Sequence, residues 1–332
     1  MNSLDQIKGL LPPDFAKHCD RDISIFTCSI FGETYSTTFK EVFSIPFTMT
    51  VWITRNTNQT TFFRSEAEHQ NFRTVLGKKV LKNEFSNHII QKLRQYTDIM
   101  NNLMKDNKSL DDFKKHKKEF IDNYQLFFAY HQAVYWPCDY IQEHHPKQKQ
   151  LINELIDSYA YSERVVPDVD AYLRRLGIDT QRHSDCLGQT DIAQVFLQTS
   201  TIILTGKETL ELYNHLSTQK KIHSNLSEIK GLGVAGSKII GKVHLIQDMS
   251  RQHEIKQDEI LVTGMTRPQF NPIIRKCKGI VTDEGSLLCH ASILAREINI
   301  PCIVGTKIAT HILKDGDMIE LEPKTGIVRR LP

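Results

Sequence analysis

The sequence lacks long apolar runs and paired cysteines. None of its apolar segments approaches the roughly 20 residues that a membrane-spanning helix needs, so no membrane span is expected. The seven cysteines include no Cys-x-x-Cys pair, which favours reduced thiols over a disulfide framework or a zinc site. Residues 1–17 lack the apolar stretch of a signal peptide. We therefore expect a cytoplasmic protein.

Strong charge of one sign is also absent. The 332 residues carry a formal net charge of +3, whereas nucleic-acid binding normally requires a clustered basic face. The densest basic run, 114–118, has a helical pattern with Phe113 and Phe120, which is typical of a solvated helix face. Nucleic acid is therefore not expected as a partner. The length is sufficient for two domains with separate cores.

The N-terminal two thirds change from a strand pattern to a helical one. Residues 1–66 are predicted to be β-rich, because 23–30 and 47–54 contain many β-branched and aromatic residues. Turn residues at 55–58 predict a hairpin between 47–54 and 60–63. Residues 67–216 are predicted to be mostly helical. Helices are expected at about 85–103, 109–127, 151–159, 167–177, 190–204 and 207–217, with interruptions at Pro137 and Pro146.

The last third of the sequence shows a different pattern of polar and apolar residues. Residues 217–230 are polar and without a sustained period, which indicates a linker. In 231–332 short apolar runs alternate with helical segments, as in a compact α/β domain. The predicted fold class is therefore multi-domain α+β, with a short β-rich start, a mostly helical N-terminal region and a C-terminal α/β domain.

One histidine in the C-terminal domain has an informative setting. Residues 279–282 are predicted to form a buried strand and 283–286 a tight loop, after which a helix begins at 289–292. His290 would then face the free N–H groups and positive dipole end of the helix, a phosphate-binding geometry. A neutral imidazole nitrogen can attack phosphorus near pH 7. The alternative is a histidine that caps the helix or packs in the core.

Two other groups of residues carry less information. Cys289 adjoins His290, but neighbouring side chains rarely point at each other, so a thiol–imidazole pair is not expected. Cys277 and Cys302 add no short metal-ligand spacing, and no metal site is predicted. The aromatic residues around 136–139 favour core packing.

Residues 229–331 resemble the mobile phosphohistidine domain of the PEP-utilising enzymes, a family that includes PEP synthase, pyruvate phosphate dikinase, the sugar-transport enzyme I, rifampicin phosphotransferase and phenylphosphate synthase. The resemblance rests on many segments in the same order. They are 231–237, 241–243, 263–268 with Pro272, 280–285, 289–297, 300–305, 315–317 and 326–328. It covers about a third of the chain and implies an α/β swivelling domain.

The resemblance implies that His290 is phosphorylated. It also implies phosphate-binding positions around this histidine, at Gly285, Ser286, Cys289, Ala291, Ser292, Thr266 and Arg267. For Thr266 the alternative is packing within its loop. Arg296, six residues after the histidine, is expected to anchor the helix. Two positions depart from the family pattern. Ser286 replaces a second glycine, and Leu288 replaces a threonine that several members use for regulatory phosphorylation.

The family normally joins this domain to an ATP-grasp part and to a PEP/pyruvate barrel or another acceptor site. Residues 1–225 contain no glycine-rich phosphate loop and no span long enough for a barrel. The chain is therefore expected to be a subunit of a split enzyme, without a cofactor of its own. Its expected partners are an ATP-grasp-like or PEP/pyruvate-binding protein, with Mg²⁺ and ATP or PEP there, and a small-molecule acceptor. The alternative is a non-catalytic binding or regulatory module.

Overall fold

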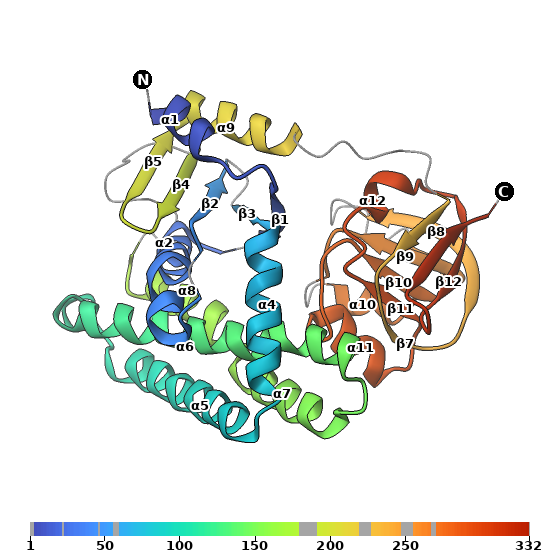
Figure 1. The fold of residues 1–332 in the computed structure, drawn as a ribbon, viewed down its shortest axis with the longest axis horizontal. Coiled ribbons are helices and arrows are strands. Elements are labelled where there is room, and N and C mark those ends of the chain that lie inside the picture. The colour runs from blue at the N-terminus through green and yellow to red at the C-terminus, as the bar shows by residue number, and fades with distance from the viewer. Residues whose placement is uncertain are drawn as a thin grey trace. The chain divides into compact units, whose positions relative to one another are not determined.

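The chain forms two compact units, Met1–Lys220 and Lys221–Pro332 (Figure 1). The computed structural model describes residues 3–21, 23–45, 47–55, 60–178, 191–218, 227–246, 255–266 and 270–331. The division between the units falls within the predicted linker, of which residues 219–226 lie outside the described part. No described helix is both long and apolar enough to cross a membrane.

The N-terminal unit is built on a five-stranded antiparallel sheet of order β1-β3-β2-β4-β5. Its strands are β1 (Phe15–Arg21), β2 (Met49–Thr54), β3 (Thr60–Ser65), β4 (Ile192–Leu197) and β5 (Thr201–Thr205). The pairing of β2 with β3 confirms the predicted hairpin. Because β4 and β5 complete this sheet, segments 1–66 and 67–216 belong to one compact unit.

Helices cover the sheet and extend beyond it. They are α1 (Ser3–Leu10), α2 (Ile25–Glu33), the π-helix η1 (Thr34–Thr38), α3 (Phe39–Phe43), α4 (Glu66–Val80), α5 (Asn83–Asp106), α6 (Leu110–His144), α7 (Lys149–Ser162), α8 (Val165–Arg175) and α9 (Gly206–Thr218). Apolar residues of α1 and α9 pack against Val51 and Phe63 on one face of the sheet. On the other face, Phe31 of α2 contacts Trp52 of β2 and stacks on Phe128 of α6.

Two predictions for this unit were wrong. Residues 23–30, expected to be a strand, lie largely in α2, whose N-cap Ser24 accepts a hydrogen bond from the N–H of Thr27. Residues 190–204, expected to be helical, contain β4 and β5. Both errors have one cause. Most of α2 and β4 is buried, so neither shows the polar face from which a helix is told from a strand.

Other predictions for the helices were confirmed. Helix α5 spans the predicted 85–103, and Ser109 caps α6 by accepting from the N–H of Asp112. The basic run at 114–118 lies on an outer face of α6, with four lysines exposed and Phe113 and Phe120 buried. A third prediction was wrong: an interruption was expected at Pro137, which lies inside α6. Burial of the surrounding turns offsets the cost of an interior proline, about 3 kcal/mol.

The C-terminal unit contains an eight-stranded mixed sheet of order β6-β13-β12-β8-β9-β10-β11-β7. Its strands are β6 (Glu228–Lys230), β7 (Leu232–Ala235), β8 (Ile239–Ile246), β9 (Glu259–Thr263), β10 (Gly279–Thr282), β11 (Cys302–Val304), β12 (Met318–Glu322) and β13 (Ile327–Arg330). Strands β8, β9, β10 and β11 are parallel, and the flanking strands are antiparallel. This is the mixed α/β unit expected for 231–332.

The core of this unit consists of two clusters, one on each face of the sheet. Three helices contribute to them: α10 (Asn271–Ile274), α11 (His290–Glu297) and α12 (Ala309–Ile312). One cluster joins Ile274 and Leu294, from α10 and α11, to Leu261 and Ile280 of the sheet. A second cluster joins α12 to Val281 and other residues. Ile280 and Val281 are adjacent in β10 and point to opposite faces, so this strand is buried on both sides.

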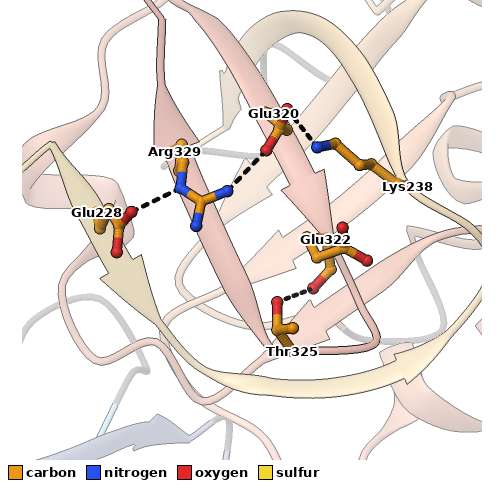
Figure 2. Close-up of polar contacts among 6 residues, drawn as sticks. All are labelled: Glu228, Lys238, Glu320, Glu322, Thr325 and Arg329. Carbon is orange, nitrogen blue, oxygen red and sulfur yellow. Dashed lines mark hydrogen bonds and ion pairs between the residues drawn. The ribbon is translucent and has the colours of Figure 1, made fainter.

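The outer edge of the sheet has a network of charged side chains (Figure 2). The Arg329 guanidinium donates to Glu228 at 2.6 Å and to Glu320 at 2.9 Å, and Lys238 lies 2.8 Å from Glu320. Lys238 and Arg329 thereby lower the pKa of the Glu320 carboxyl. Glu228 belongs to β6, which pairs with β13. Residues 228–230, predicted to be linker, are therefore the edge of the sheet.

Candidate functional site

His290 is the first residue of α11 and stands at the end of a short connection from β10. The connection begins at Asp283, directly after the strand, and ends at the N-cap Cys289. Parallel strands place such connections at one edge of a sheet, where ligands commonly bind. The sequence prediction of strand, tight loop and helix is confirmed over 279–297.

The start of the loop is tied to the neighbouring connection by Asp283. Its carboxylate accepts hydrogen bonds from the hydroxyl of Thr306 at 3.1 Å, from the N–H of Thr310 at 3.0 Å and from the hydroxyl of Thr310. The N–H of Lys307 donates to the carbonyl of Asp283 at 2.8 Å. These bonds fix the loop on a rigid support, as a site for precise chemistry requires.

The backbone conformation at Gly285 and its close neighbours both require a residue without a side chain. Its φ of +132° lies in a region that L-residues rarely adopt. A Cβ atom at this position would lie 2.9 Å from Sγ of Cys289 and 3.1 Å from Cβ of Val304. Gly285 therefore lets the loop pass closely beneath the start of α11.

The serine after this glycine has a structural role within the turn. The Ser286 hydroxyl is fully buried and accepts from the N–H of Leu288 at 3.2 Å. The Ser286 carbonyl accepts from the N–H of Cys289 at 3.2 Å and from the hydroxyl of Ser292 at 2.6 Å. Arg296 donates to the Leu287 carbonyl at 2.5 Å, which confirms that it anchors the helix. The side chains of Ser286 and Ser292 thus bond within the turn.

The imidazole of His290 has a partner on each nitrogen. Nδ1 lies 2.9 Å from Oγ1 of Thr266, and Nε2 lies 2.7 Å from Oδ1 of Asn271. An amide oxygen only accepts, so this orientation of Asn271 requires a proton on Nε2. The neutral ring then carries its lone pair on Nδ1, to which the Thr266 hydroxyl donates.

Burial lowers the pKa of His290 below its ordinary value of 6.5, while the charge of Glu297 acts in the opposite direction. Desolvation has this effect because it disfavours the protonated, charged ring. The ring is consequently neutral over more of the range near pH 6 to 7 than an exposed histidine. A neutral imidazole is the form that can act as a nucleophile.

The N-terminus of α11 provides hydrogen-bond donors for an anion. Its first helical bond joins the N–H of Ile293 to the Cys289 carbonyl at 3.0 Å, and no side chain caps the helix. The N–H groups of His290, Ala291 and Ser292 therefore project from the helix end. Donors in this position stabilise a phosphate, with the dipole contributing about 0.3–2 kcal/mol for one charged group.

The structure brings most of the predicted site residues together. Thr266 contacts the ring directly, and Cys289 is the N-cap, with its Sγ 3.3 Å from Oγ of Ser292. Ala291 contributes its backbone, because its side chain is buried in the core. Arg267 lies outside the described residues. Among the described residues, no group of three or more His, Cys, Asp or Glu is placed to hold a metal ion.

Asn271 is a site residue that the sequence reasoning missed. It is the first residue of α10 and lies 19 positions before His290. A polar residue at a helix start, directly before Pro272 and after the Thr266 loop, was the available signal. That signal indicates a helix start and cannot identify the partner of the side chain, which depends on how α10 packs against α11.

Comparisons with known proteins agree on the C-terminal unit. Residues 255–326 match the family model of the PEP-utilising enzyme, mobile domain. The match includes all of the site from Thr266 to Ser292 and ends in the last turn of the sheet.

Curated relatives of the chain include phosphoenolpyruvate synthases. A probable one from Methanothermobacter thermautotrophicus is 33% identical over 172 residues, covering 50% of this chain and 24% of that protein. The Pyrococcus furiosus enzyme is 43% identical over 100 residues, covering 30% and 12%, and that of Escherichia coli is 36% identical over 131 residues, covering 38% and 16%. The chain thus spans about a quarter or less of the length of these relatives. The match to the Methanothermobacter protein covers 50% of this chain, which is more than the length of the C-terminal unit, so that match extends into the N-terminal unit.

Proposed function

We propose that His290 carries a phosphoryl group between a donor and an acceptor, because it lies in the segment 255–326 that matches the family model of the PEP-utilising enzyme, mobile domain. The observation that carries the proposal is the setting of the imidazole. It is partly buried, has a lowered pKa, is held by Thr266 and Asn271, and stands at an uncapped helix N-terminus.

The proposed chemistry has two transfers that mirror each other. In the first, the lone pair of a ring nitrogen attacks phosphorus, an N–P bond forms, and the bond to the donor breaks with its electron pair leaving on the donor oxygen. In the second, an acceptor oxygen attacks phosphorus and the N–P electron pair returns to the ring. The N–H groups at the start of α11 stabilise the phosphoryl oxygens in between.

The chain's own residues provide the carrier, and the energy for transfer must come from elsewhere. The helix dipole contributes too little to drive phosphoryl transfer from ATP or PEP, about 0.3–2 kcal/mol. We therefore propose that a partner protein of ATP-grasp-like or PEP/pyruvate-binding type holds the donor with Mg²⁺, as in a split PEP-synthase-like enzyme. Residues 1–216 would dock that partner or bind the small-molecule acceptor.

Phosphorylation of the chain in the presence of candidate partners tests the proposal. With ³²P-labelled ATP or PEP, the isolated chain should take up little label. With the partner it should acquire a phosphate that is stable to base and labile to acid. His290→Ala should lose the label and keep its circular dichroism spectrum. His290→Asn is a control that retains a polar side chain at the helix start.

Two outcomes would contradict the proposal. If His290→Ala is labelled as well as the parent, His290 is not the carrier. If no nucleotide- or PEP-binding partner labels the chain, the alternative of a non-catalytic binding or regulatory module is favoured.

A further inference from the structure

We propose that the N-terminal unit forms a two-fold dimer with a second copy of this chain, through antiparallel pairing of β5 with β5 of the second copy. Strand β5 (Thr201–Thr205) stands at one edge of the five-stranded sheet and pairs with β4 on its inner side (Figure 1). In the described part of the chain, no strand pairs with its outer side. The proposal goes beyond the carrier role of His290 and uses no residue of the C-terminal unit.

The two edges of this sheet differ in how they are protected against another strand. Strand β1, at the opposite edge, has the exposed Lys17, and its register with β3 shifts between Lys17 and Cys19. Charged side chains and bulges are devices that keep an edge strand from pairing with another chain. Strand β5 has no charged residue and no proline, and its register with β4 is regular throughout. It is therefore the edge of this sheet that lacks such devices.

Two hydrogen bonds determine which backbone groups of β5 face inward. The N–H of Leu197 donates to the Ser200 carbonyl at 2.8 Å, and the N–H of Gly206 donates to the Asp191 carbonyl at 3.0 Å. Both pairs continue the register of β4 with β5. Hydrogen-bonded pairs alternate with non-bonded pairs in an antiparallel ladder. The residues of β5 with even numbers, Ile202 and Leu204, therefore bond to β4.

The other residues of β5 direct their backbone groups to the outer edge. They are Thr201, Ile203 and Thr205, and each presents one N–H and one carbonyl there. Thr201 is exposed and the other two are half-buried. The outer edge thus offers three donors and three acceptors in the alternating pattern that another strand requires.

The strand is complementary to itself, because Thr-Ile-Ile-Leu-Thr reads almost the same in both directions. With Ile203 opposite Ile203 of the second copy, Thr201 lies opposite Thr205 of that copy. These pairs join residues that face outward, so their backbone groups form about six hydrogen bonds between the copies. Ile202 then lies opposite Leu204, and such apolar cross-strand pairs stabilise a ladder. A two-fold axis through the Ile203 pair uses the same surface on both copies.

Helices next to the edge add apolar surface. Helices α1 and α9 contact β5, and on them Leu10 and Leu210 are 50% and 49% exposed. Side chains paired across an antiparallel ladder point to the same face, so α1 and α9 of both copies would lie on one side of the joined sheet. Strands of this length bury less than the roughly 1,200 Å² of a standard interface. We therefore expect a weak dimer, with a dissociation constant on the order of 10–100 μM.

The association of the full chain is measured by sedimentation equilibrium, and residue-resolved hydrogen exchange locates the interface. We expect a monomer in dilute solution and a reversible dimer at about 100 μM and above. The amides of Thr201, Ile203 and Thr205 should exchange rapidly in the monomer and become protected in the dimer. Those of Ile202 and Leu204 should be protected in both, because they bond to β4.

Charged variants test the register. Thr201→Lys/Thr205→Lys places like charges opposite each other and should weaken the dimer by about tenfold or more at low salt. Thr201→Lys/Thr205→Glu places opposite charges there and should retain it. Thr37→Lys/Thr325→Lys is the matched control, because it adds two lysines at exposed positions outside β5, and it should associate like the parent. His290→Ala should also associate like the parent, so a failure of the carrier role leaves this result intact.

The proposal is overturned if the folded chain stays monomeric at concentrations on the order of 500 μM. It is also overturned if the Lys/Lys variant of β5 associates as well as the parent, if the Lys/Glu variant associates no better than the Lys/Lys variant, or if the matched control loses as much affinity. Where a variant of β5 does not fold by circular dichroism, hydrogen exchange of the parent decides. Equal protection of the three outward amides in dilute and concentrated solution would mean that β5 is not the interface.

Discussion

Oδ1 of Asn271 lies 2.7 Å from Nε2 of His290, and this contact sets the protonation of the ring that we propose as the phosphoryl carrier. With the amide oxygen turned toward the ring, Nε2 holds the proton and Nδ1 accepts from Thr266. Rotation of the amide would present its NH₂ group and reverse both roles. The orientation of the Asn271 amide therefore determines which ring nitrogen carries the lone pair.

The first prediction concerns the tautomer. Asn271→Asp should hold the proton on Nε2, because a carboxylate only accepts, and should raise the pKa of His290 through its charge. Asn271→Ala should give a mixture of both tautomers. The ¹⁵N chemical shifts of the ring, recorded at a pH where His290 is neutral, distinguish the two. Identical shifts in the parent and in Asn271→Ala would mean that Asn271 does not determine the tautomer.

The second prediction concerns the titration of His290. Because burial lowers its pKa, the midpoint in the folded chain should lie below 6.5, and Glu297→Gln should lower it further. The unfolded chain takes up the proton first as the pH falls. The contribution of His290 to stability is thus complete above about pH 6.5 and is lost as the pH falls toward the folded pKa. The ring ¹³C shift of His290, assigned with His290→Asn, measures the midpoint. A midpoint at or above 6.5 would contradict the burial of the ring.

The third prediction concerns the loop before the histidine. Gly285→Ala should destabilise the C-terminal unit by about 1–3 kcal/mol, because it forces a Cβ into a positive φ and against Cys289. Gly264→Ala is the control, since no atom lies within 4 Å of its added Cβ, and it should change stability by less than about 0.5 kcal/mol. Hydrogen exchange of β10 and β11 amides compares the two variants. Equal effects would show that the loop tolerates a side chain.

Local sequence was sufficient for much of the site and for the amphipathic helices. The loop and helix around His290 were predicted from glycine and the strand pattern, and α5 from its repeating apolar residues. Contacts that depend on packing were not predicted. Asn271 meets the ring of His290 only because α10 lies against α11. Elements that are mostly buried were predicted wrongly because they have no polar face from which a helix is told from a strand. In β4, Ile192, Val195 and Phe196 have helical spacing, yet both faces of the strand are covered.

The fourth prediction concerns the start of α2. The carboxylate of Asp170 in α8 accepts from the N–H of Ser24 at 3.1 Å, from its hydroxyl at 2.5 Å and from the hydroxyl of Thr27 at 2.8 Å. Asp170→Ala leaves these buried donors without their acceptor and should destabilise the N-terminal unit by about 3 kcal/mol.

Asp168→Ala on the same helix is the matched control. Asp168 is partly exposed and lies 3.8 Å from Arg164, so its loss should cost less than about 1 kcal/mol. Thermal unfolding by circular dichroism and hydrogen exchange of α2 provide the comparison. If both variants melt together, Asp170 does not hold α2 in place.

The last prediction concerns where the C-terminal unit begins. A fragment 227–332 should fold alone, because its sheet and both core clusters lie within it. A fragment 231–332, which starts at the boundary predicted from the sequence, lacks β6 and with it Ile229, which is 3% exposed. Loss of that buried side chain alone costs about 1.5–3 kcal/mol, and the N–H of Arg330 also loses its bond to the Ser227 carbonyl. The shorter fragment should therefore unfold at lower urea concentration. Arg329→Ala in the longer fragment is the control, because it removes the surface pairs with Glu228 and Glu320 and keeps β6, and surface pairs contribute little. Equal midpoints for the two fragments would mean that β6 is dispensable and that the core of the unit begins at Gly231.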